Sequence, residues 1–101
     1  MINQQPPAHL QRETRKWFAA VCHEYALEEH QLRILTLAAE AWDRNCAANE
    51  TLAKQGLTYT DRLGALRLRP EIGVERDSRI SFNRLCRELR LDANVIPHTP
   101  R

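Results

Sequence analysis

The chain has 101 residues, of which 43% are hydrophobic and 28% charged, with a net charge of +2. That length allows one domain with a modest core, and the composition excludes a disordered or low-complexity chain. No apolar run approaches the roughly 20 residues of a membrane span, and the first residues lack the pattern of a signal peptide. We therefore expect a protein of the cytoplasm that does not associate with membranes.

The chain begins with a segment that lacks periodicity and continues into an amphipathic helix. Residues 1–10 contain Pro and Gln, and we expect a flexible arm that ends in an anchor at Leu10. From about Gln11 to Ala26, apolar residues recur at spacings of one, three and four, which predicts a first helix. The residues of its apolar face are Trp17, Phe18, Val21, Cys22 and Tyr25.

The second predicted helix is the longest element, from about Glu28 to Gln55, with Gly56 as its C-cap. It carries two apolar stripes, which indicates either two partners or one broad contact. At about 1.5 Å per residue it exceeds the length that the first helix could cover. Trp42 fits an ordinary core position or a subunit interface, where Trp is enriched. The residues that we predict at an interface between copies of the chain are Leu35, Ala38, Ala41, Trp42 and Leu52.

A short β-hairpin or extended loop is expected between the second and third helices. Residues 57–60 are β-prone, residues 61–64 supply a turn that ends in Gly, and residues 66–69 alternate strictly. Pro70 is expected as the first residue of a third helix, which runs from about Glu71 to Arg90. The predicted fold is mainly α, with three helices in a single domain over residues 11–91, a long central helix, and a tendency to oligomerise. Residues 92–101 are expected to form a flexible tail.

The positive charge of the chain lies in its second half. Residues 57–101 contain nine basic and six acidic side chains, whereas residues 1–56 contain six and seven. Thirteen of the fifteen basic residues are Arg, which suits bidentate phosphate contacts, although GC-rich coding and a solvated helix face would give the same pattern. The predicted DNA-binding residues are Arg62, Arg67 and Arg69 in the hairpin, and Arg76, Arg79, Arg87 and Arg90 on the third helix. Of these two groups we expect the hairpin to make the stronger contact.

No arrangement of residues predicts catalysis. Three Gly residues cannot form a P-loop or a dinucleotide fingerprint, and the four His residues are scattered. Each of the three Cys residues falls on an apolar helix face, where Cys acts as a small hydrophobic side chain. We therefore expect no catalytic residue, no metal and no cofactor.

Residues at several places along the chain resemble the phage terminase small subunit family. These are Trp17–Phe18, Leu27–Glu28 with His30, Leu32–Arg33, Leu37–Arg44, Gly56–Tyr59 with Asp61, Arg62 and Gly64, Arg69–Glu71, Glu75–Arg79, Leu85, Arg87–Leu89 and Leu91–Asp92. The similarity covers about residues 6–92. No single motif is specific to the family, but the order and spacing of the motifs together are. The chain departs from the family at Gln11–Arg12, where other members often have Ser-Pro or a similar N-cap.

This resemblance implies a role in viral DNA packaging in the host cytoplasm. Its implied partners are a large subunit that carries the ATPase and nuclease, viral double-stranded DNA, and further copies of the chain in a closed ring. The chain itself would not be an enzyme. Two alternatives remain open, a small helical DNA-binding regulator and a purely structural protein-interaction module. The long second helix disfavours the regulator, because a helix-turn-helix joins short helices.

Overall fold

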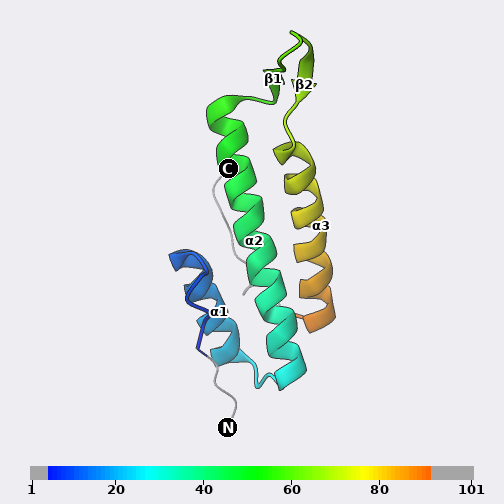
Figure 1. Cartoon of the computed structure of the whole chain (residues 1–101). Helices are drawn as coiled ribbons and strands as arrows, with labels where there is room; N and C mark the ends of the chain where they lie inside the picture. Colours follow the sequence, from blue (N-terminus) through cyan, green and yellow to red (C-terminus); the bar gives the residue numbers. More distant parts are fainter. Residues whose placement is uncertain (1–4, 92–101) are drawn as a thin grey trace.

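In the computed structural model, which describes residues 5–91, the chain forms three helices, with a two-stranded sheet between the second and the third in chain order. These elements are α1 (Arg12–Glu24), α2 (Glu29–Gln55), β1 (Thr58–Thr60), β2 (Leu66–Leu68) and α3 (Glu71–Leu89). The molecule is elongated, 57 Å long and 23 Å wide. Helices α2 and α3 run side by side in opposite directions, and the hairpin projects beyond the end where they meet (Figure 1). The predicted mainly helical fold with a hairpin between the last two helices is confirmed.

The ends of α2 follow from local sequence. At its start, the backbone N–H of Glu28 donates to the side-chain oxygen of Gln31 at 2.8 Å, which is one half of a capping box. At its end, Gly56 has a φ of 82°, and its N–H donates to the carbonyl of Leu52. Because a positive φ strains any residue with a Cβ, glycine is suited to this position. The predicted C-cap is confirmed.

The start of α1 depends on a residue of another helix. The side chain of Gln11 makes no capping hydrogen bond. Instead, the carboxylate of Asp43 on α2 accepts the backbone N–H of Gln11 at 2.8 Å and the hydroxyl of Thr14. This carboxylate also lies at the positive end of the α1 dipole. Asp43 therefore fastens α1 to α2.

The described part of the predicted N-terminal arm, residues 5–10, is also attached to α2. Leu10 is buried in the core, as expected of an anchor. His9 Nε2 lies 2.8 Å from a carboxylate oxygen of Glu40. Residues 1–4 of the arm and the predicted tail, 92–101, lie outside the described residues.

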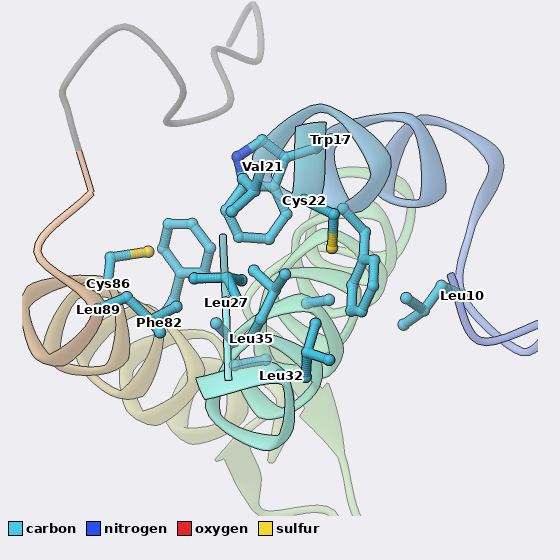
Figure 2. Close-up of a cluster of buried hydrophobic side chains, with 14 residues drawn as sticks. Leu10, Trp17, Val21, Cys22, Leu27, Leu32, Leu35, Phe82, Cys86 and Leu89 are labelled. Carbon is cyan, nitrogen blue, oxygen red and sulfur yellow. The ribbon is translucent and has the colours of Figure 1, made fainter. Parts of the chain in front are cut away.

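Aromatic contacts join the three helices in the core. Phe82 of α3 is buried, and its ring centroid lies 5.6 Å from that of Trp17 on α1 and 5.0 Å from that of Trp42 on α2. Figure 2 shows Phe82, Trp17 and Leu35 within the same cluster. One aromatic side chain therefore links all three helices.

The partner of the long apolar face of α2 is α3. Leu35, Ala38 and Ala41 have no exposed surface and lie in the core of the chain itself. Trp42 and Leu52 are half-buried, and Trp42 packs on Phe82. The structure thus corrects the premise that α1 alone had to cover α2. It leaves Leu35, Ala38 and Ala41 with no surface for a second copy.

Candidate nucleic-acid interface

The seven predicted DNA-binding arginines do not form one site. Three lie in or beside the hairpin, at one end of the molecule, three lie along α3, and Arg90 is the C-cap of α3 (Figure 1). At 1.5 Å per residue, α3 alone separates Pro70 from Arg90 by about 30 Å. The arginines therefore make a hairpin group and an α3 group, whose surroundings differ.

The turn of the hairpin is organised by Asp61. One carboxylate oxygen accepts the backbone N–H groups of Leu63 and Ala65, each at 2.9 Å. The other oxygen accepts Nε of Arg67 at 3.0 Å. The hydrogen bond from Arg67, followed by that from Ala65, lowers the pKa of the Asp61 carboxyl group. The turn closes through Gly64, whose φ is 82°. The charge of Arg67 is consequently paired within the hairpin.

Arg69 is held at the junction of the hairpin with α2. Its Nη2 donates to the carbonyl of Gln55 at 3.3 Å, at the negative end of the α2 dipole. Its guanidinium carbon lies 5.9 Å from the centre of the Tyr59 ring, a cation–π distance. Arg69 therefore positions the hairpin on the end of α2. Arg62, in the turn, is exposed and makes no hydrogen bond or ion pair with the rest of residues 5–91.

The strand register gives the hairpin two chemically different faces. Tyr59 pairs with Arg67, so these side chains share one face with Arg69, which we call the basic face. Thr58 pairs with Leu68 and Thr60 with Leu66 on the opposite side, which we call the apolar face. The sequence analysis did not predict that Tyr59 belongs to this face. Pairing of the two predicted strands across the turn could have indicated it, because that pairing sets Tyr59 opposite Arg67.

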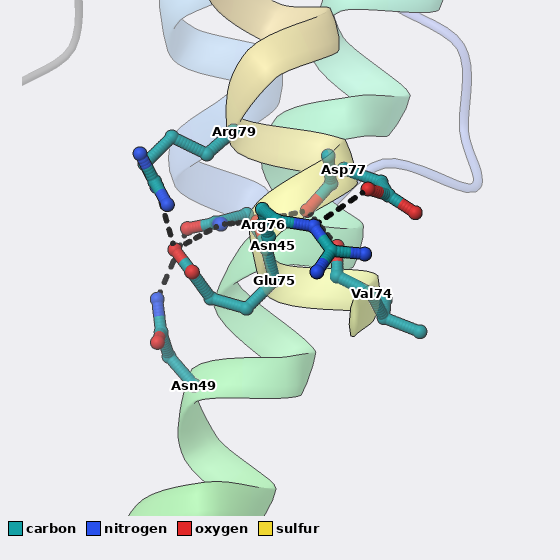
Figure 3. A network of polar contacts seen from close by, with 8 residues as sticks. Asn45, Asn49, Val74, Glu75, Arg76, Asp77 and Arg79 are labelled. Atoms are coloured by element: carbon teal, nitrogen blue, oxygen red, sulfur yellow. Dashed lines mark hydrogen bonds and ion pairs between the residues drawn. The ribbon is translucent and has the colours of Figure 1, made fainter. Parts of the chain in front are cut away.

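Two arginines of α3 are paired with carboxylates (Figure 3). Nε of Arg79 lies 3.1 Å from Oε2 of Glu75, an ion pair at the i,i+4 spacing that favours such pairs on a helix. The same Oε2 accepts the side-chain amide of buried Asn45 on α2 at 3.0 Å. Nε of Arg76 lies 3.1 Å from a carboxylate oxygen of Asp77. Arg79 thus belongs to the polar network that joins α2 to α3.

The free positive charge of α3 lies in its last two turns. Arg84, Arg87 and Arg90 are exposed, and none makes a hydrogen bond or ion pair through its side chain within the described part of the chain. Cations at this end of a helix are favoured by the helix dipole. Arg84 was not among the predicted contacts. The most available arginines are therefore at the end of α3 opposite the hairpin.

Other chemistry is sparse in the described residues. Burial raises the pKa of the Cys22 thiol, and that of Cys86 to about 11, so both thiols stay protonated at neutral pH. Residues 5–91 contain no cluster of three or more potential metal ligands. No helix in the same range is both long and apolar enough to cross a membrane.

Comparisons of the chain with known protein families, with curated proteins and with solved structures find no match.

Proposed function

We propose that the chain is the small subunit of a viral DNA-packaging terminase. In this proposal it binds viral double-stranded DNA in the host cytoplasm, as a homo-oligomeric ring, and regulates a large subunit that carries the ATPase and nuclease. The resemblance over residues 6–92 supports the family assignment. Several residues of that resemblance have clear places in the fold: Gly56 ends α2, while Asp61 and Gly64 form the hairpin turn.

The observation that carries DNA binding is the group of exposed, unpaired arginines at the end of α3. Guanidinium groups that are not already bound to a carboxylate can neutralise DNA phosphates, and the counterions condensed on those phosphates are then released. Arg67 and Arg69 are already engaged in the hairpin. We therefore place the stronger contact at Arg87 and Arg90, and a weaker one at Arg62 on the hairpin. Repetition around a ring would add up weak contacts multivalently.

Fluorescence anisotropy with a labelled duplex, over a series of salt concentrations, tests this contact. Replacing Arg87 and Arg90 by Ala should weaken binding for all DNA sequences and flatten the salt dependence. The matched control replaces Arg33 and Arg76, which removes the same charge from residues paired with Glu29 and Asp77. Equal effects of the two double variants would show that only net charge matters. A wild-type protein that does not bind DNA at low salt would refute DNA binding.

Regulation of a large subunit has its own test. Under this proposal the purified chain neither hydrolyses ATP nor cleaves DNA in the presence of magnesium. It changes the ATPase rate of the large subunit from the same virus when the two are mixed. Intrinsic ATP turnover that persists through purification would contradict the assignment.

A purely structural protein-interaction module is the second candidate, and the exposed apolar hairpin favours it. Leu63, Leu66 and Leu68 are all exposed, which is typical of a protein contact rather than of a phosphate contact. Self-association without DNA binding at any salt concentration would support this candidate over the terminase subunit.

A further inference from the structure

The exposed apolar side chains of the chain are concentrated in the hairpin. Of eight exposed large hydrophobic residues in the described part of the chain, five lie between residues 57 and 68. All six strand residues are exposed as well. An isolated two-stranded hairpin is only marginally stable in water. This hairpin therefore has the character of an element that is completed by another molecule.

The apolar face is suited to contact between proteins. Its members are Thr58, Thr60, Leu66 and Leu68, and none carries a charge. Leu66 is 71% exposed and Leu68 is 68% exposed, so the described chain leaves most of both side chains uncovered. None of these four strand residues offers a cation to DNA, which is a polyanion. The basic face, with Arg67 and Arg69, lies on the opposite side.

We propose that the apolar face of the hairpin is the surface through which copies of this chain associate. Because the face is uncharged, two identical copies can meet there without repulsion, whereas two basic faces would repel each other. Within residues 5–91 the sheet consists of β1 and β2, so each strand has one edge that no other described strand pairs with and that a strand of another copy can join. Contact on this side leaves Arg67 and Tyr59 facing outward.

This inference deepens the proposed function, because it names the surface that builds the oligomer. It rests on that function only for the existence of an assembly of identical chains. The hairpin itself is formed within one chain, through Asp61 in the turn and through the hydrogen bond from the N–H of Arg69 to the carbonyl of Leu57. Changes on the apolar face therefore leave the turn and the helices in place.

The main experiment measures the mass of the assembly by light scattering over a range of protein concentrations. Leu66→Thr with Leu68→Thr removes the apolar surface and retains β-branched residues that suit a strand. We expect wild-type protein at a multiple of 11.7 kDa and this double variant at 11.7 kDa, with unchanged helical circular dichroism. The matched control, Leu37→Ser with Ile80→Ser, removes two exposed apolar residues outside the hairpin and should keep the wild-type mass.

A second variant separates loss of contact from loss of folding. Thr58→Lys places like charges on the two contacting faces without removing an apolar group. It should dissociate the assembly at low salt, and high salt should restore it by screening. Misfolding would not be reversed in this way.

Two results would overturn the inference, namely a wild-type monomer at every concentration, or wild-type mass in the Leu66→Thr and Leu68→Thr double variant. Duplex binding is measured on the same samples. An assembly that depends on the hairpin but binds no DNA would support this interface and reject the terminase function. DNA binding by an assembly that ignores the hairpin changes would reject the interface alone.

Discussion

Replacement of Phe82 by Ala should destabilise the whole domain, because this ring is the contact common to all three helices. It is 3% exposed and lies against Trp17 and Trp42. Truncation of a buried Phe to Ala typically costs about 3–5 kcal/mol, since it removes apolar contacts and leaves a cavity. The two tilted aromatic contacts add roughly 0.5–1.5 kcal/mol each to the loss. We therefore expect a cost in the upper part of the range for a Phe truncation.

Urea and thermal unfolding, followed by circular dichroism, measure this cost. For a domain of this size each kcal/mol lowers Tm by roughly 4–8 °C, so a fall of at least about 15 °C is expected. Protein concentration must be equal in all samples, because association of copies would make Tm depend on concentration. The control Ile80→Ala changes a 45% exposed residue of the same helix and should cost less than about 1 kcal/mol. A loss below about 2 kcal/mol for Phe82→Ala would refute the view that this ring joins the three helices.

Three further predictions follow from the polar and small residues of the fold. Asp43→Ala removes the acceptor for the Gln11 N–H and the Thr14 hydroxyl, so it should lower the free energy of unfolding by about 1–2 kcal/mol and speed amide hydrogen exchange in the first turn of α1. The control Asp43→Asn keeps an acceptor oxygen and should lower it less. The pKa of Asp61 is lowered in the folded hairpin, so its carboxylate stabilises the hairpin fully above the ordinary aspartate pKa, and this stabilisation is lost as the pH falls through the folded pKa. NMR shifts of the hairpin amides should follow this loss, and the pH dependence should be absent in Asp61→Asn. Ala41→Glu would bury an unpaired charge, so circular dichroism should show unfolding rather than a folded monomer, and a stable, fully helical variant would contradict the burial of this residue.

The positions of the secondary-structure elements could be predicted from the sequence, because they depend on local backbone preferences. Gly56 and Gly64 mark the two positive-φ glycine positions, and Pro70, expected as the first residue of α3, is its N-cap. Strict alternation in residues 66–69 predicted the second strand, and helical periodicity predicted the three helices. Helix ends differ from the predicted ones by two residues or fewer; α1, predicted from about Gln11 to Ala26, spans Arg12–Glu24.

Only the tertiary structure decided which surfaces are covered and which charges are free. An apolar stripe has the same sequence pattern whether it packs on its own chain or on a second copy, so Leu35 and Ala38 could not be assigned to core or interface from the pattern. The i,i+4 pair of Arg79 was readable in the sequence, since both residues are on one helix. The contacts of Asp43 with α1 and of Arg69 with the end of α2 were not, because they join residues that only folding brings together. Whether a charged residue finds a partner far away in the sequence depends on how the helices pack. For that reason only the tertiary structure shows which arginines at the end of α3 are unpaired.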